Sequence, residues 1–135
     1  MSLARPMKPR KLPALRVSER IDERMDEMFP RCITSLPEVD TTFAGVRGWV
    51  AQGATTQTVF FDIQPAGDVP PHSHGEQWGI VVDGELEFTI DGVTRVYRKG
   101  DSYHIPAGVV HSARIPTRCR VIDFFPDPDR HKIKA

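Results

Sequence analysis

Hydrophobic and polar side chains alternate most regularly in residues 85–90, which read ELEFTI. Three apolar residues occupy every second position, with two glutamates and a threonine between them. Because successive side chains of a strand point to opposite faces, this stretch predicts a strand with one buried face. The Asp-Gly pairs at 83–84 and 91–92, on either side of it, are typical of tight hairpin turns.

Other stretches also have the composition of strands. Residues 46–52 and 56–65 are rich in β-branched and aromatic side chains, and residues 118–126 predict a last strand. Glycines recur every eight residues, at positions 84, 92, 100 and 108. The residues between these glycines do not match one another, so the interval indicates strand spacing and not a sequence repeat. Short strands at regular intervals predict an all-β sandwich or barrel.

The N-terminal part of the chain has a different pattern. Residues 1–16 contain five basic residues, three prolines and no acidic residue, which predicts an extended arm. Ser18 is a suitable N-cap and Pro30 a suitable stop for a short amphipathic helix that packs on the main body. Its apolar positions, at helical spacing, are Val17, Ile21, Met25 and Met28.

Composition and charge argue against several kinds of partner. The chain has 135 residues, enough for one domain, and its 18 basic and 18 acidic side chains give a net charge of zero. This balance offers no electrostatic basis for binding nucleic acid or a membrane surface, and no apolar run has the length of a membrane span. Cys32 and Cys119 lack the spacing of a paired motif, so we expect a cytoplasmic protein that needs no disulfide.

Two histidines lie close together in residues 70–84, PPHSHGEQWGIVVDG. The two prolines before them keep the chain extended, so His72 and His74 point to the same side. Imidazoles are the commonest protein ligands for divalent transition metals. The pair is therefore a candidate metal site, although two histidines in a polar loop would read the same way.

These histidines belong to the first of two spaced motifs. The first motif consists of Gly67, His72, His74, Gln77 and Gly84. The second consists of Gly100, Pro106, Gly108 and His111. Together they resemble the two signature motifs of the cupin superfamily, and the second fits at every position. The motifs cover residues 67–111, and the flanking strands extend the resemblance to 36–126.

The resemblance implies a jelly-roll β-barrel with one divalent transition metal per chain, which could be manganese, iron, nickel, cobalt or zinc. The implied ligands are His72, His74, Gln77 and His111. It also implies a small-molecule substrate or ligand and a homodimer. The chain then divides into an N-terminal arm and short helix (1–35), a cupin barrel (36–126) and a charged C-terminal tail (127–135).

The fourth ligand position departs from the usual cupin pattern. Cupins commonly carry Glu where the count back from Gly84 reaches Gln77, and the neighbouring Glu76 faces inward only if the strand has a bulge. Three imidazoles and an amide leave the metal's charge uncompensated. This favours Lewis-acid catalysis, of isomerase or lyase type, on a small polar metabolite such as a sugar acid or another carboxylate. Two alternatives stay open, a non-catalytic module that binds a small ligand and an iron-dependent dioxygenase.

The sequence singles out no one residue as the general base. Glu76, His104 and Tyr103 are the nearest candidates along the chain. Trp78 is compatible with a pocket wall, the core or an interface, and His131, in the charged tail, is expected to be solvated. Four phenylalanines are expected in the core, namely Phe60, Phe61, Phe124 and Phe125.

Overall fold

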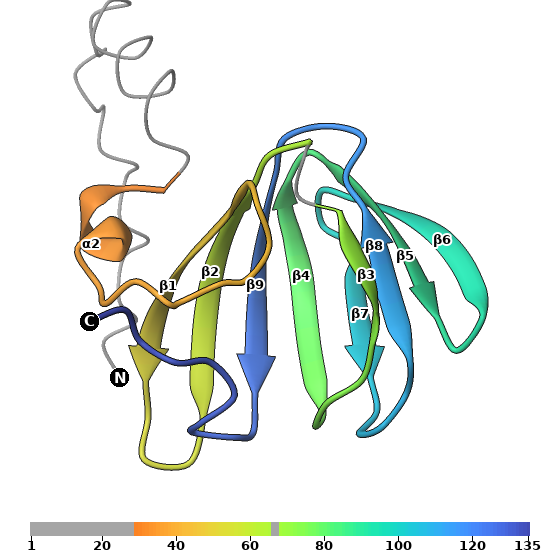
Figure 1. Cartoon of the computed structure of the whole chain (residues 1–135). Coiled ribbons are helices and arrows are strands. Elements are labelled where there is room, and N and C mark those ends of the chain that lie inside the picture. The colour runs from red at the N-terminus through yellow and green to blue at the C-terminus, as the bar shows by residue number, and fades with distance from the viewer. Residues whose placement is uncertain (1–28, 66–67) are drawn as a thin grey trace, which may run out of the picture.

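The computed structural model describes residues 29–65 and 68–135. The predicted arm and the helix predicted to end at Pro30 lie almost wholly outside the described residues. The described part of the chain forms two antiparallel sheets that face each other, with a short helix, α2 (Arg31–Thr34), beside one end (Figure 1). The predicted all-β jelly roll is confirmed. No helix among the described residues is long and apolar enough to span a membrane.

The chain passes several times from one sheet to the other, so that strands far apart in the sequence, such as β2 and β9, become neighbours. In chain order they are β1 (Val46–Gln52), β2 (Gln57–Ile63), β3 (Val69–His72), β4 (Gln77–Asp83), β5 (Glu85–Ile90), β6 (Val93–Arg98), β7 (Ser102–Ile105), β8 (His111–Arg114) and β9 (Cys119–Phe125). One sheet has the order β1-β2-β9-β4-β7, and the other has the order β3-β8-β5-β6. The four stretches predicted as strands are confirmed, with their ends shifted by two residues or fewer.

The core lies between the two sheets and follows the alternation of the sequence. In β5, Leu86 and Phe88 are buried, as the ELEFTI pattern predicts. The turn after β5 has positive φ angles of 51° at Asp91 and 77° at Gly92, which suits a tight hairpin turn. Cys119 is buried and Cys32 is exposed, and both thiols are free.

The outer face of the five-stranded sheet also carries aromatic residues. Phe60 is half-buried there because Phe29 packs on it, with ring centroids 5.8 Å apart. Phe124 faces outward beside its register partner Trp78, and the two are 40% and 43% exposed. The prediction that all four phenylalanines are in the core is therefore wrong for Phe124. It holds for Phe61 and Phe125, whose parity along the strand points them inward.

Beyond β9 the C-terminal segment folds back past β2 toward β1 (Figure 1). Its backbone pairs with residues 38–40, where the Asp40 N–H donates to the Lys132 carbonyl at 2.7 Å and the Lys134 N–H donates to the Glu38 carbonyl at 2.8 Å. His131 packs edge-on against the ring of Phe125, at 5.1 Å between centroids. The expectation that His131 is solvated is wrong, because this backbone pairing turns the residue toward the sandwich interior.

Candidate metal centre and its pocket

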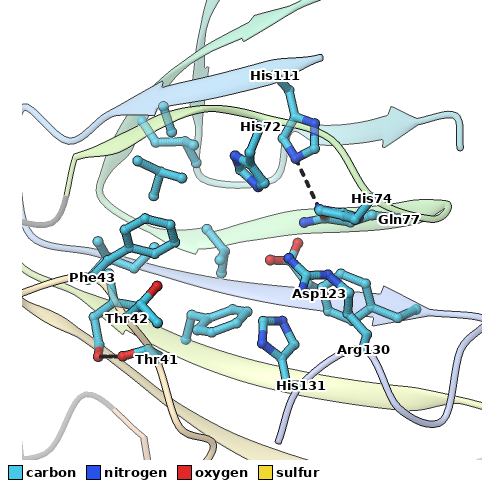
Figure 2. Close-up of a pocket in the computed structure, with 18 of the residues that line it drawn as sticks. Thr41, Thr42, Phe43, His72, His74, Gln77, His111, Asp123, Arg130 and His131 are labelled. Carbon is cyan, nitrogen blue, oxygen red and sulfur yellow. Dashed lines mark hydrogen bonds between the residues drawn. The ribbon is translucent and has the colours of Figure 1, made fainter. Parts of the chain in front are cut away.

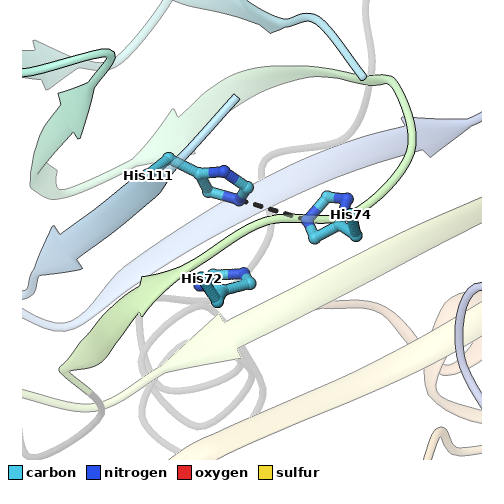
Figure 3. A group of neighbouring side chains, drawn as sticks. All are labelled: His72, His74 and His111. Carbon is cyan, nitrogen blue, oxygen red and sulfur yellow. Dashed lines mark hydrogen bonds between the residues drawn. The ribbon is translucent and has the colours of Figure 1, made fainter. Parts of the chain in front are cut away.

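Three histidines from distant parts of the chain meet at one end of the pocket. His72 ends β3, His111 begins β8, and the two are register partners across the sheet. His74 follows β3 in the loop that leads to β4. Among the described residues these three form a group in which one ring nitrogen from each histidine lies within 4.8 Å of the other two (Figure 3). The predicted convergence of the two motifs is thus present in the fold.

Backbone carbonyls orient all three imidazole rings. The Nδ1 atom of His72 lies 2.9 Å from the Pro70 oxygen, and that of His74 lies 2.7 Å from the Gly75 oxygen. The Nδ1 atom of His111 lies 2.9 Å from the Val109 oxygen. Because a carbonyl only accepts hydrogen bonds, each Nδ1 carries a proton, and a neutral ring then has a free lone pair on Nε2. This is the arrangement by which proteins prepare imidazoles for a metal.

The electrostatics of the cluster favour neutral rings at His74 and His111. Burial, reinforced by the positive charge of Arg130, lowers the pKa of His74 to about 4. Burial also lowers the pKa of His111. The Nε2 atoms of His74 and His111 lie 3.1 Å apart, and two unprotonated acceptors at that distance repel unless a cation lies between them. The donor set therefore fits a divalent metal.

The side chains of Gln77 and Glu76 point to opposite faces of the sheet. Gln77 opens β4, is 6% exposed and lines the pocket. Glu76 is exposed and pairs with His104, with 2.7 Å between Oε2 and Nε2. Neither Glu76 nor His104 lines the pocket. Two of the three candidates for a general base, Glu76 and His104, thus lie outside the pocket. No bulge turns Glu76 inward.

Tyr103, the third candidate, lines the pocket but donates its proton elsewhere. Its hydroxyl donates to Oδ1 of Asp123 at 2.5 Å, across strand β4. Burial and the charge of Asp123 hold the pKa of Tyr103 well above its usual value. The phenol therefore stays protonated and serves as a donor to Asp123. Gly79 makes this contact possible, because a Cβ there would lie 2.1 Å from Asp123 Oδ1 and 2.4 Å from the Tyr103 ring.

Asp123 is a pocket residue that sequence reasoning missed. It is buried, and burial raises the pKa of its carboxyl to about 6. Hydrogen bonds from Tyr103 and Gln77 and the charge of Arg130 oppose that rise. The signal was available in the alternation of β9, where Cys119, Val121 and Phe125 face inward and place the carboxylate of Asp123 on the same face.

Arg130 and His131 enter the pocket from the C-terminal segment, beside Asp123 in Figure 2. The Nε atom of Arg130 is buried and has no hydrogen-bond partner in the described part of the chain, and the guanidinium lies 5.8 Å from the centre of the Phe125 ring. Burial, together with the adjacent charge of Arg130, lowers the pKa of His131 to about 4. No pattern in the sequence indicated these two residues, because their position depends on the backfolding of the tail.

The pocket has a volume of about 520 Å³ and extends well beyond the histidines. Its polar lining includes the three histidines together with Gln77, Asp123 and Arg130, and further the residues Asp40, Thr41, Thr42, His131 and Lys132. Trp78 does not line it. A buried carboxylate, a guanidinium and a group of imidazoles in one cavity suit a small anionic ligand bound next to a metal.

Comparison with known proteins agrees with this architecture. Residues 59–125 match the family described as "Cupin domain". A Bacillus subtilis protein named H2HPP isomerase is 39% identical over 80 residues, which cover 58% of this chain and 34% of that protein. The chain thus spans about a third of the length of this curated relative.

Solved structures provide further similarities. An RmlC-like cupin from Shewanella frigidimarina is 28% identical, with a TM-score of 0.64, and the match covers 78% of this chain and 94% of that one. The structure of KdgF from a Halomonas species is 26% identical, with a TM-score of 0.60, and the match covers 68% of this chain and 88% of that one.

Proposed function

The chain belongs to the cupin superfamily, and from this membership we propose that it is a mononuclear metal-dependent enzyme that isomerises or cleaves a small carboxylate metabolite. The observation that supports the proposal most strongly is the set of three Nε2 lone pairs directed into one pocket. His72, His74 and His111 would hold the metal, with Gln77 as the fourth ligand. A divalent metal bound there supplies a Lewis acid that polarises a carbonyl oxygen.

Arg130 binds the carboxylate of the substrate. Its guanidinium is always charged, and its Nε lies buried in the pocket wall with no hydrogen-bond partner among residues 29–65 and 68–135. A planar guanidinium and a carboxylate form paired, charge-assisted hydrogen bonds that fix the orientation of the bound acid. Arg130 thereby sets which carbon atom of the substrate faces the opposite wall.

Asp123 transfers the proton. Its carboxylate is buried in the pocket and held from behind by the Tyr103 hydroxyl and the Gln77 amide. The Tyr103 hydrogen bond fixes Oδ1, and the two contacts together keep the carboxylate in place in the pocket wall. An isomerisation next to a carbonyl moves a proton from one carbon atom to another. One group can remove the proton and return it, and in this proposal Asp123 does both.

The similarities to other proteins support an isomerase or lyase class. The Bacillus subtilis relative is named an isomerase. The neutral amide at position 77, where many cupins carry a carboxylate, leaves the centre more strongly electron-withdrawing. This feature favours carbonyl activation over the oxygen chemistry of an iron-dependent dioxygenase.

Hydrogen–deuterium exchange tests the proposal without knowledge of the natural substrate. The full chain, loaded with nickel or manganese, is incubated with 2-oxo acids in D2O, and loss of the proton at carbon 3 is followed by NMR. We expect exchange that depends on metal and falls by about 100-fold in Asp123→Asn, with metal content unchanged. The control is Asp129→Asn, an exposed carboxylate of the C-terminal segment that follows β9.

Other outcomes of this experiment would contradict the proposal. Tight binding of an acid without exchange would indicate a non-catalytic ligand-binding module. Oxygen consumption by the iron-loaded chain, with no exchange under nitrogen, would indicate a dioxygenase. Exchange that persists in Asp123→Asn would exclude the role given to Asp123.

A further inference from the structure

The outer face of the five-stranded sheet carries a row of apolar side chains across its middle. Phe60 of β2, Ile122 of β9 and Ile80 of β4 follow one another as register partners, so their side chains lie on three adjacent strands. Trp49 of β1 extends the row to the edge of the sheet, where Phe29 packs on it. Trp49 is 5% exposed, whereas the other three members of the row are only half-buried. This apolar row is therefore well covered at its β1 end and less covered toward β4.

The chain enters this face from the β1 side. Residues after α2 pair with β1, where the Val39 N–H donates to the Gly48 carbonyl at 2.8 Å. Phe29, which precedes α2, already lies over two strands, because its ring centroid is 6.2 Å from that of Trp49 and 5.8 Å from that of Phe60. Followed from α2 back to Phe29, the chain thus moves from the edge of the sheet toward β9. The segment directly before Phe29 starts at that point.

Arg120 of β9 places a positive charge beside Phe29. Its guanidinium lies 5.3 Å from the centre of the Phe29 ring, and its Nη2 atom lies 3.6 Å from a carboxylate oxygen of Asp83. Its Nε atom is buried and has no hydrogen-bond partner in the part of the chain that the structure describes. Asp26 and Glu27 come three and two residues before Phe29. A carboxylate brought next to Arg120 would accept this hydrogen bond and stabilise the buried donor.

The sequence before Phe29 matches this surface in pattern and in charge. Residues 18–28 contain five acidic and two basic residues. Ile21, Met25 and Met28 recur at helical spacing, which predicts one apolar stripe. A helix this short is not stable by itself in water, so it forms where a surface of the protein buries its stripe.

The length of this segment matches the width of sheet beyond Phe29. A helix over residues 18–28 would be roughly 16 Å long, and the three strand spacings from β2 to β7 add up to roughly 14 Å. Trp78 and Phe124 lie roughly 7 Å further along their strands than Ile80 and Ile122, whereas a helix covers roughly 5 Å on either side of its axis. A helix on the apolar row would therefore leave Trp78 and Phe124 exposed for contact with another chain.

We propose that residues 18–28 form a helix that docks on the apolar row of their own chain. The apolar stripe of the helix packs on Ile122 and Ile80, and an acidic side chain of its last turn pairs with Arg120. Because Phe29 already packs on this face, no linker separates the helix from its binding surface. The segment of the same chain therefore reaches the row at a lower cost in entropy than a separate molecule would.

Amide hydrogen exchange of the full chain, followed by mass spectrometry of peptides from residues 18–28, tests the proposal. We expect these amides to exchange at least about tenfold more slowly than in a synthetic peptide of the same sequence, because docking has to open before they exchange. Ile122→Ser, on the sheet, should remove this protection. Met25→Ser should remove it from the other side of the contact, and it applies even if Ile122→Ser fails to fold, since Met25 lies outside the barrel strands.

Two matched controls carry the same substitution at positions that the contact does not use. Val96→Ser lies on the exposed strand β6, and Glu23→Ser lies on the predicted polar face of the helix. Both should leave the exchange of residues 18–28 unchanged.

Three outcomes would overturn the proposal. Exchange of residues 18–28 in the wild type as fast as in the peptide would exclude a docked helix. Protection that survives both Ile122→Ser and Met25→Ser would place the helix on another surface. Protection that is lost on dilution from tens of micromolar to below about one micromolar would show that the segment comes from a second chain.

Discussion

The side-chain amide of Gln57 hydrogen-bonds both backbone polar groups of His131. Its Nε2 donates to the His131 carbonyl at 3.0 Å, and its Oε1 accepts from the His131 N–H at 2.9 Å. Gln57 is 1% exposed, so these two bonds form away from water. They fix the C-terminal segment, and with it Arg130, over the pocket.

Replacing Gln57 with leucine should therefore lower the free energy of unfolding by about 2 kcal/mol or more, because the backbone groups of His131 lose their partners. Urea denaturation followed by circular dichroism measures the change. Gln64→Leu, at an exposed position, should stay within about 0.5 kcal/mol of wild type. Equal losses in the two variants would show that the amide of Gln57 does not anchor the segment.

The contact between Tyr103 and Asp123 depends on Gly79. Gly79→Ala would place a Cβ against both side chains, so we expect a loss of about 1–3 kcal/mol in unfolding free energy and a displaced Asp123. Gly75→Ala is the control, because a Cβ there meets nothing within 4 Å. Unchanged stability of Gly79→Ala would mean that the sheet opens at this point at no cost.

Much of the fold was predictable because each strand has one buried face. Alternation identified β5, and β-branched and aromatic composition identified β1, β2 and β9. The spacing of the two motifs identified the three histidines. His72 and His74 of the first motif lie at and just after the end of β3, and His111 of the second motif begins β8. Strand parity also placed Gln77 inside and Glu76 outside, which the structure bears out.

The parts of the pocket that were missed depend on tertiary contacts. Arg130 and His131 reach the cavity because the tail pairs with residues 38–40, and no local pattern encodes that pairing. Phe124 was placed in the core on hydrophobicity alone. Its inward-facing neighbours in β9 show that parity should have placed it outside.

The fourth ligand is tested by two adjacent substitutions. Gln77→Ala should weaken nickel or manganese binding by about tenfold or more, and Glu76→Ala should leave it unchanged, because only Gln77 lines the pocket. Gln77→Glu should retain metal and favour its oxidised states. Isothermal titration of the three variants provides the affinities. A large loss for Glu76→Ala alone would contradict the assignment of Gln77.

The homodimer stays a prediction, with the outer face of the five-stranded sheet as its expected contact. Trp78 and Phe124 lie side by side there and are both exposed. Exposed apolar clusters of this kind mark interaction surfaces. Light scattering at tens of micromolar should give the mass of two chains, and Phe124→Asp should give that of one. Val93→Asp, on the other sheet, serves as control, and a monomeric wild type with and without metal would refute the dimer.

Metal analysis of protein purified without an affinity tag tests the central claim most directly. We expect about one divalent transition metal per chain in the wild type and in His104→Ala, whose imidazole lies outside the pocket. The variants His72→Ala, His74→Ala and His111→Ala should each lose stoichiometric metal while their circular dichroism spectra stay unchanged. Full metal content in all three of these variants would contradict the metal centre and the function built on it.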